Sequence, residues 1–298
     1  MAKRIFLFLA TNILIMLAIT VVVNVVGLFF PGLLRGGYGG LLTMCLIWGM
    51  VGSFISLQLS RWMAKRSLDI QIVDGATGNP DLDWLHGTIQ RLAGDVALPM
   101  PEVGYYESDE VNAFATGPSR SRSLVAVSSG LLKTMNRAEI EGVLGHELSH
   151  IANGDMVTMA LIQGVVNAFV MFLAQVIGWA AGRAMSNDRD GDRGPSAMEW
   201  MVQFAVTMVM QVLLGMLAGL ITSWFSRRRE FRADAGGSRL AGRAKMIAAL
   251  RKLQSVHEAL DPRAGELATA KINGKSWLSA FSTHPPLEVR IEALERGA

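Results

Sequence analysis

Five consecutive residues, His146-Glu147-Leu148-Ser149-His150, combine two imidazoles and a carboxylate in a pattern suited to metal-assisted hydrolysis. Residues four apart share one face of an α-helix, so His146 and His150 can bind the same ion. Glu147 would project beside the open coordination position, where it can take a proton from an attacking water. The spacing therefore predicts a zinc site in which the two histidines are ligands and Glu147 is the catalytic base.

A third protein ligand is needed, because a catalytic zinc site commonly has three of them and a water. The other histidines are His86, His257 and His284, and none follows the motif at the metzincin spacing. His86 and His257 lie on the polar side of predicted helices, where a solvated surface role is the simpler interpretation. A carboxylate is then the best choice, and Glu230 is the best candidate. The alternative is an ordinary surface glutamate beside an arginine run.

Four stretches without a charged residue would position these groups at a membrane, and each exceeds the ~20 apolar residues that cross a hydrocarbon core. They are Ile5–Phe30, Tyr38–Ser60, Met156–Gly182 and Trp200–Phe225. The first is far longer than a signal-peptide core, so we expect it to be retained. A hairpin of the third and fourth spans returns the chain to one membrane face. We therefore expect Glu230 to begin a helix just after the fourth span, close to the two histidines.

The distribution of charge also indicates a membrane protein with a soluble part. Hydrophobic residues make up 51% of the 298 residues and charged residues 18%, and most charges fall within 61–155 and 227–298. This partition excludes an ordinary soluble protein, a disordered chain and a nucleic-acid module spread over the whole length. The net charge of +3 is modest, which also argues against nucleic acid as a partner. A single cysteine, Cys45, excludes an intrachain disulfide framework.

Strongly basic flanks lie on one side of the spans, before the first and after the second and fourth. On the other side the first loop has only Arg35, and the arginines of the 183–199 loop are matched by acidic residues. The positive-inside rule then places both termini and both charged parts in the cytoplasm. Arg227–Arg229 is interpreted as an anchor on acidic lipid head groups. The predicted organisation is two transmembrane helices in 1–60, a catalytic part in 61–155, a transmembrane hairpin in 156–226 and a second catalytic part in 227–298.

Local patterns predict an α+β fold for the catalytic parts. Asn136 and Glu139 form a capping-box-like start for the helix that carries the histidines, which should end near Asn153-Gly154. Periodicity and turn residues predict the other elements. These are a helix at Asp81–Gly94, strands at Glu102–Tyr106, Val111–Ala115 and Leu124–Ser128, a helix from Glu230 to about Asp261, a looser stretch, and a helix from Pro286.

Four motifs together resemble the HtpX-type membrane metallopeptidases, which are relatives of the CAAX-processing zinc peptidases. They are N-A-F-A-T-G, H-E-L-S-H-I-x-N-G-D, R-R-E-F-x-A-D-A and T-H-P-P-L-x-x-R-I. The resemblance covers nearly the whole chain, including four spans in the expected order. It implies a polytopic α-helical membrane protein with a gluzincin-like α+β zinc-protease domain. It also implies one zinc ion (Zn2+) per subunit, held by His146, His150 and Glu230.

The resemblance suggests roles for four further residues. Asp234, one helical turn after Glu230, would accept a hydrogen bond from the free nitrogen of His146 and fix that ring. His284 is a candidate for stabilising the oxyanion, or else a residue that simply precedes a proline-started helix. Arg290 is a candidate for the substrate-binding side, holding His284 or a carboxylate, with a plain surface arginine as the alternative. Asn112 would hydrogen-bond a substrate that adds as a strand.

The implied function is quality control of damaged membrane proteins under stress, at the cytoplasmic face of a bacterial inner membrane. Its partners would be protein substrates and the lipid bilayer, with no nucleic acid. An intramembrane-cleaving metalloprotease is disfavoured because the motif helix carries Arg137, Glu139 and Glu141. A CAAX-type processing peptidase shares the zinc motif, but four spans suit it poorly. A non-enzymatic scaffold has no need of Glu147. These patterns leave the substrate and the oligomeric state open.

Overall fold

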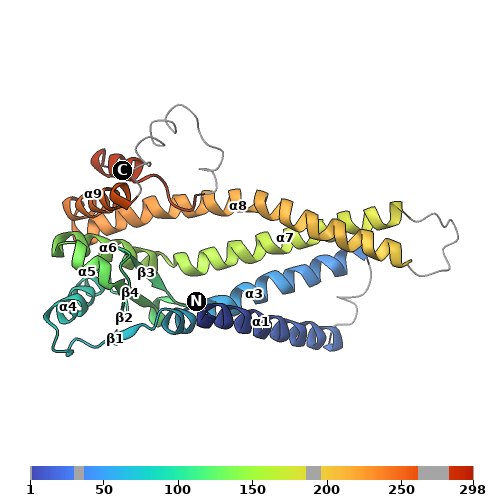
Figure 1. Cartoon of the computed structure of the whole chain (residues 1–298), viewed down its shortest axis with the longest axis horizontal. Helices are drawn as coiled ribbons and strands as arrows, with labels where there is room; N and C mark the ends of the chain where they lie inside the picture. Colours follow the sequence, from blue (N-terminus) through green and yellow to red (C-terminus); the bar gives the residue numbers. More distant parts are fainter. Residues whose placement is uncertain (1, 30–36, 186–195, 261–281, 298) are drawn as a thin grey trace. The chain divides into compact units, whose positions relative to one another are not determined.

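The computed structural model describes residues 2–29, 37–185, 196–260 and 282–297 (Figure 1). Most of the loops 31–37 and 183–199, which the predicted topology places outside the cytoplasm, lie outside these ranges, as does most of the looser stretch before Pro286. The chain forms two compact units. One contains Met1–Leu7, Leu57–Met159 and Ser223–Ala298, and the other contains Phe8–Ser56 and Ala160–Thr222.

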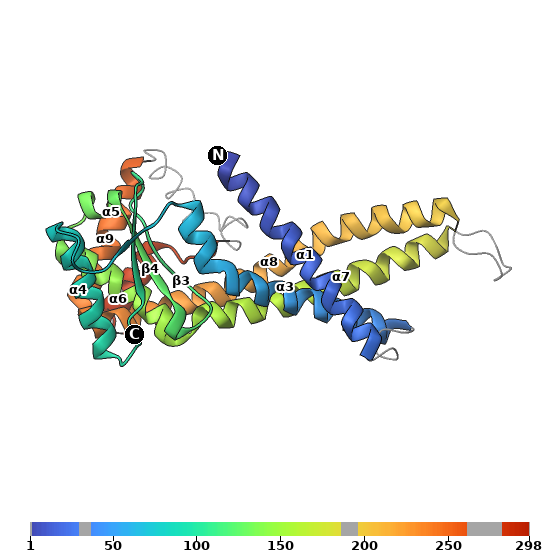
Figure 2. The same ribbon diagram turned by 90° about the horizontal axis from the view of Figure 1, so that it is seen from below.

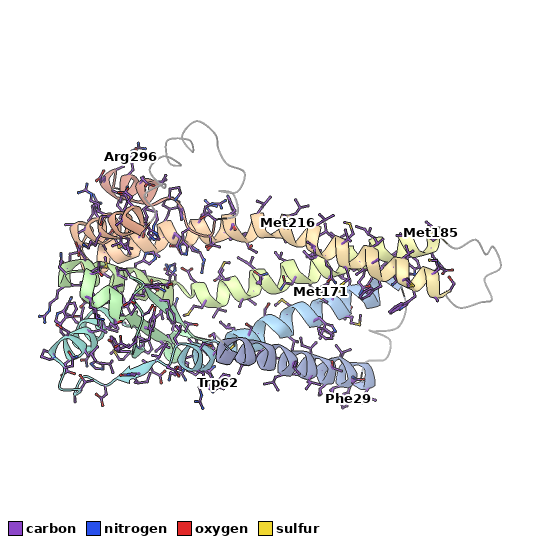
Figure 3. The ribbon with its side chains drawn as sticks, viewed as in Figure 1. Phe29, Trp62, Met171, Met185, Met216 and Arg296 are labelled. Carbon is purple, nitrogen blue, oxygen red and sulfur yellow. The ribbon has the colours of Figure 1, made fainter. Side chains whose placement is uncertain are left out.

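Long apolar helices make up the second unit. They belong to α1 (Ala2–Phe29), α3 (Gly37–Ser67), α7 (Asp155–Ala184) and α8 (Ala197–Ala241). Among the described residues, α3, α7 and α8 are long and apolar enough to cross a membrane, and Leu17–Phe29 of α1 is a shorter apolar helix. Large apolar side chains along these helices are exposed, Met216 of α8 among them (Figure 3). Such an exposed apolar surface is expected where a helix faces lipid.

Close packing joins α7 to α8 within this unit. A side chain at Gly178 would collide with Thr207 and with the carbonyl oxygen of Gln203 on α8. Small residues let the backbones of membrane helices approach closely. Dispersion contacts then stabilise the helix pair, because in lipid there is no hydrophobic driving force between helices.

A four-stranded sheet forms the centre of the first unit. Its strands are β1 (Gln71–Val73), β2 (Glu102–Tyr106), β3 (Ala113–Thr116) and β4 (Leu124–Ser128), in the order β1-β2-β4-β3. Only β2 and β4 are parallel, and β3 is an edge strand. The strands predicted at 102–106 and 124–128 are confirmed. The third begins later than predicted, because its ladder with β4 starts at Ala113. The short β1 was not predicted.

Helices cover the two faces of this sheet. On one face Val103, Val125 and Val127 pack in a core with α4 (Pro80–Asp95), α5 (Ser129–Thr134) and α6 (Arg137–Asn153). On the other face Leu124 and Ala126 pack against the end of α3 (Figure 2). Burial on both faces explains the uninterrupted apolar run of β4, because neither face of that strand meets water.

The C-terminal part is helical, as predicted, with one correction. Glu230 does not begin a helix, because α8 runs without a break from Ala197 to Ala241. No glycine or proline lies between the apolar segment and Glu230, so nothing in the backbone ends the helix there. Gly242, with φ of 98°, ends α8. Two further helices are α9 (Arg243–Leu260), which packs on α6, and α11 (Leu287–Glu295), which packs on α9.

Candidate active site

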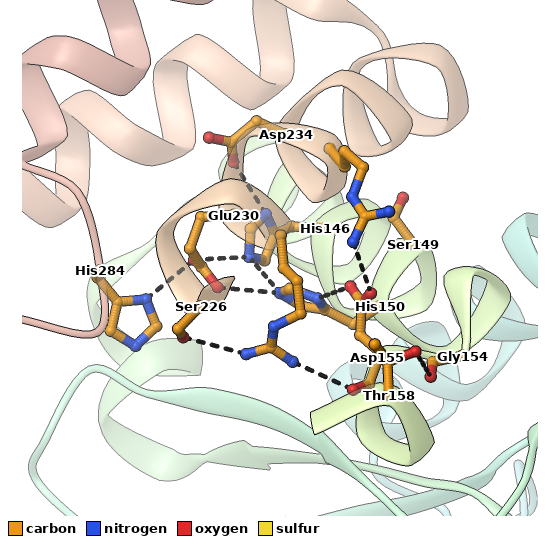
Figure 4. A network of polar contacts seen from close by, with 12 residues as sticks. His146, Ser149, His150, Gly154, Asp155, Thr158, Ser226, Glu230, Asp234 and His284 are labelled. Atoms are coloured by element: carbon orange, nitrogen blue, oxygen red, sulfur yellow. Dashed lines mark hydrogen bonds and ion pairs between the residues drawn. The ribbon is translucent and has the colours of Figure 1, made fainter. Parts of the chain in front are cut away.

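Helix α6 places both motif histidines on one face. Its capping box is formed, with Asn136 accepting from the backbone of Glu139 and Glu139 accepting from the backbone of Asn136. Gly154 caps the other end in the left-handed conformation, with φ of 69°. His146 and His150 lie one turn apart, and their Nε2 atoms are 3.1 Å from each other (Figure 4). Both rings therefore present a nitrogen to the same point.

Glu230 of α8 meets these two nitrogens. Its Oε1 lies 3.3 Å from His150 Nε2, and its Oε2 lies 3.5 Å from His146 Nε2. The Glu230 side chain is 2% exposed, which is unusual for a carboxylate unless it is paired or binds a cation. The helix that carries it packs against α6 through glycines. A Cβ at Gly237 would lie only 2.9 Å from the backbone nitrogen of His146.

The three groups fit a divalent metal ion. Ligand atoms of His146, His150 and Glu230 all lie within 4.8 Å of one another. Glu230 Oε2 is buried and accepts no hydrogen bond of good geometry from any described residue, although nitrogens of three side chains lie within 3.5 Å of it. A buried lone pair of this kind is costly unless it coordinates an ion. Two imidazoles and one carboxylate form a common donor set of catalytic zinc.

Electrostatics within the cluster favour ionised Glu230 beside the two imidazoles. Burial alone would raise the pKa of Glu230, but His146, His150 and His284 lower it well below its usual range. Burial alone would lower the pKa of His150, but Asp155 and Glu230 raise it to about 9. Each group thus stabilises the charged form of its neighbour. A metal ion would take the place of these protons on binding, so metal affinity depends on pH.

Asp234 and Arg290 support the first histidine. Asp234 Oδ1 lies 2.9 Å from His146 Nδ1. Arg290 of α11 donates to both oxygens of Asp234, through Nε at 2.7 Å and Nη2 at 2.6 Å. Burial alone would raise the pKa of Asp234, but Arg290 and His146 lower it. Arg290 is itself buried, so these contacts favour its role in holding a carboxylate over direct contact with substrate.

Glu147 lies on α6 between the two histidines and is half-buried. Within the described part of the chain, no hydrogen bond or ion pair engages its carboxylate. His284 is 66% exposed, yet its Nδ1 lies 2.9 Å from Glu230 Oε2. The backbone before it is fixed, because Arg227 donates to the carbonyl oxygen of Ser282 at 2.9 Å. His284 therefore sits at the open side of the cluster.

Asn112 lies one residue before the edge strand β3, which begins at Ala113 and not at Val111 as predicted. Its backbone nitrogen donates to Ser128 Oγ at 3.1 Å, and its side chain is exposed. Strand β3 also lies next to α6, and one of its edges carries no partner strand among the residues that the structure describes. Backbone groups along that free edge could pair with an extended peptide.

Two residues of this network were missed by sequence reasoning. Asp155 contacts His150, and Arg229 contacts Asp155. Asp155 is the last letter of the H-E-L-S-H-I-x-N-G-D motif, which was the available signal. Arg229 was interpreted as one of three equivalent lipid anchors. In the structure the three arginines differ, since Arg228 lies over the Trp224 ring at 5.0 Å while Arg229 turns toward the site.

Comparisons with known proteins agree with this geometry. The model of peptidase family M48 matches residues 81–298. A protease HtpX from Tolumonas auensis is 49% identical over 294 residues, covering 98% of both chains. One from Idiomarina loihiensis is 48% identical over 297 residues, covering 99% of both. The fold resembles the crystal structure of S. mikatae Ste24p with a TM-score of 0.64 at 19% identity, over 99% of this chain and 66% of that one.

The matched residues include the whole cluster, and the similarity to the full-length relatives extends over the apolar helices of this chain as well as its peptidase part. The chain therefore belongs to peptidase family M48 and is a multi-pass membrane metalloprotease.

Proposed function

We propose that the chain is a zinc-dependent endopeptidase that cleaves membrane proteins at the cytoplasmic face of a bacterial inner membrane. The observation that carries this proposal is the convergence of His146, His150 and Glu230 beside the unengaged carboxylate of Glu147. One zinc ion per subunit fits this donor set. The bacterial relatives named as protease HtpX support the same activity. Quality control of damaged proteins under stress is the biological role that we propose with it.

When bound by His146, His150 and Glu230, zinc would polarise the scissile carbonyl and lower the pKa of the attacking water. Glu147 accepts the proton of that water and delivers it to the leaving amine. Asp234 accepts a hydrogen bond from His146 Nδ1, which leaves Nε2 free to face the cluster. Arg290 holds Asp234 through two nitrogens and so keeps this orientation.

Substrate would bind in an extended conformation along the free edge of β3, because backbone pairing there is independent of side-chain sequence. Asn112 is placed to hydrogen-bond that peptide near the start of the strand. His284, exposed at the open side of the cluster, is placed to donate to the oxyanion that develops during attack. Both roles are part of the proposal.

The cytoplasmic orientation rests on the basic flanks of the spans. It assigns 1–60 and 156–226 to the transmembrane helices, and it assigns 61–155 and 227–298 to the catalytic parts in the cytoplasm. A CAAX-type processing peptidase is the second candidate, because it would share the zinc motif His146-Glu147-Leu148-Ser149-His150. The near full-length identity to protease HtpX chains favours the first.

The test uses full-length protein purified in detergent and an unfolded test protein, with and without a chelator. We expect cleavage that the chelator abolishes and added zinc restores. Glu147→Gln should retain zinc but lose activity by roughly 10²–10⁴-fold, the usual contribution of a general base. Glu258→Gln, an exposed glutamate on α9, is the matched control and should cleave normally. Cleavage that survives both the chelator and Glu147→Gln would refute the proposal, and activity on a prenylated peptide alone would favour the second candidate.

A further inference from the structure

Asp155 is a buried carboxylate that the mechanism above does not use. It is the first residue of α7, and its side chain is 2% exposed. Its Oδ2 lies 2.7 Å from His150 Nδ1, the ring nitrogen that faces away from the cluster (Figure 4). The same relation holds between Asp234 and His146, at 2.9 Å. We propose that Asp155 is the positioning residue of His150, so that each metal-binding histidine is oriented by its own buried carboxylate.

The orientation matters because an imidazole must present a deprotonated nitrogen to a metal ion. A carboxylate that accepts from Nδ1–H fixes the tautomer with the lone pair on Nε2, fixes the plane of the ring and increases its basicity. His150 Nε2 is the nitrogen that meets Glu230, at 3.3 Å. The contact with Asp155 therefore acts on the correct nitrogen to prepare His150 as a ligand. This inference rests on the proposed metal site.

Two arginines of α8 hold Asp155 in place. Arg229 Nη1 donates to the backbone oxygen of Asp155 at 3.4 Å, and its Nη2 donates to Ser226 Oγ at 3.1 Å. Arg232 Nη2 lies 3.6 Å from Asp155 Oδ1. The arrangement parallels the one around His146, where Arg290 holds Asp234. In both cases a histidine of α6 contacts a carboxylate, and that carboxylate contacts an arginine from a segment distant in sequence.

A merely structural role for Asp155 makes a different prediction. An acidic residue in the first turn of a helix stabilises that helix through the macrodipole. If this were its only role, replacing Asp155 would lower the stability of the metal-free protein and leave metal affinity nearly unchanged. Asp155→Asn is the informative variant, because the amide has nearly the same size and suits a helix start. It removes the negative charge that His150 and Arg232 face, and it replaces one acceptor oxygen with an amide donor.

The experiment uses full-length protein in detergent, stripped of metal and titrated with zinc against a competing chelator. We expect Asp155→Asn and Asp234→Asn each to weaken zinc binding by about 10–100-fold, the usual effect of losing such a partner. Asp81→Asn is the matched control, because Asp81 pairs with Arg137 at 3.2 Å on the surface. It should bind zinc as wild type does. Cobalt substitution adds a second readout, since a turned His150 ring should change the visible ligand-field bands.

Three outcomes would overturn the inference. Zinc affinity of Asp155→Asn within about twofold of wild type, far less than the expected loss, would show that the carboxylate does not prepare His150. Weakened binding with an unchanged cobalt spectrum and an equal loss of stability in the metal-free protein would assign Asp155 a structural role. Wild-type protein that binds no zinc would overturn the proposed zinc site together with this inference, whereas the first two outcomes leave that site intact.

Discussion

Replacing Glu230 tests the least local element of the site, because this residue is 80 positions from His150 in the sequence. Glu230→Gln keeps the volume of a side chain that is 2% exposed, so the packing of α8 on α6 should survive. It removes the charge that His146, His150 and His284 contact at 3.5, 3.3 and 2.9 Å. Two neutral imidazoles and water would then be a poor match for catalytic zinc.

The expected loss can be sized from the binding energy of zinc. Structural zinc sites with four protein ligands bind with about 10–16 kcal/mol, so one ligand contributes roughly 2.5–4 kcal/mol. At about 1.4 kcal/mol per factor of ten, zinc affinity should fall by roughly two to three orders of magnitude. Asp234→Ala should cost less, about 10–100-fold, because Asp234 acts through His146. We therefore expect zinc retention in the order wild type, Asp234→Ala, Glu230→Gln.

Equilibrium dialysis of detergent-purified protein against graded zinc buffers measures this order. Helical content must be recorded for each variant, because an unfolded chain would also lose zinc. Glu288→Gln, an exposed glutamate of α11, is the matched control and should bind zinc normally. Zinc binding by folded Glu230→Gln at wild-type affinity would refute the ligand assignment. His284 would then be the next candidate ligand, since its Nδ1 lies 2.9 Å from Glu230 Oε2.

Two further predictions concern topology and stability. In a Cys45→Ser background, Arg35→Cys and Asp190→Cys should react with a membrane-impermeant maleimide in intact cells, while Ala76→Cys should react only after permeabilisation. Labelling of Ala76→Cys in intact cells would contradict the cytoplasmic orientation. Burial alone would raise the pKa of Glu141, but Lys245 and Arg91 lower it, and the net pKa is lowered. The stability that this carboxylate contributes is therefore present above its unfolded pKa, and it is lost as the pH falls through its folded pKa. Glu141→Gln should thus lower the unfolding free energy at neutral pH by up to about 1 kcal/mol, with the deficit vanishing in acid, and equal deficits at both pH values would contradict this.

Local sequence patterns were sufficient for elements whose own residues determine them. The capping box at Asn136 and Glu139 predicted the start of α6, and the apolar runs predicted β2 and β4. Three of the four long uncharged stretches predicted helices that can span a membrane, in α3, α7 and α8, whereas the first coincides with the shorter apolar helix Leu17–Phe29 of α1 in the described residues. In each case the signal lies within the element, through side chains that cap its end or face its core. The family resemblance, the fold class and the enzyme class are confirmed by the comparisons.

Elements that depend on a partner could not be predicted in the same way. Strand β1 has three residues and exists through its pairing with β2, so no periodicity could develop in it. The start of β3 is set by its ladder with β4 and not by its apolar residues. Helix α5 has six residues, and its N-cap Ser128 belongs to the preceding strand. The uncharged stretch Trp200–Phe225 indicated where the apolar part of α8 ends, but the helix itself continues to Ala241.

The contacts around His150 were missed for a related reason, since they join three segments that sequence reasoning treated separately. Arg229 follows an apolar span, where an arginine run has a sufficient explanation as an anchor on lipid head groups. Asp155 precedes another apolar span, and an acidic residue there is sufficiently explained by the stabilisation that it gives to the first turn of a helix. The structure shows that Asp155 Oδ2 lies 2.7 Å from His150 Nδ1 and that Arg229 Nη1 lies 3.4 Å from the Asp155 backbone oxygen.

The continuity of α8 explains how one helix can serve both histidines. Glu230 and Asp234 lie four residues apart and so share one face, which lets Glu230 meet both rings while Asp234 reaches the far side of His146. This requires α8 to approach α6 at backbone distance. Side chains at Gly236 and Gly237 would meet Ser149 and the His146 backbone, at 2.5 and 2.9 Å. The Gly-Gly pair after Asp234 is therefore part of the metal site, although neither glycine supplies an atom to it. A larger residue there would separate the two helices and move the carboxylates away from the histidines.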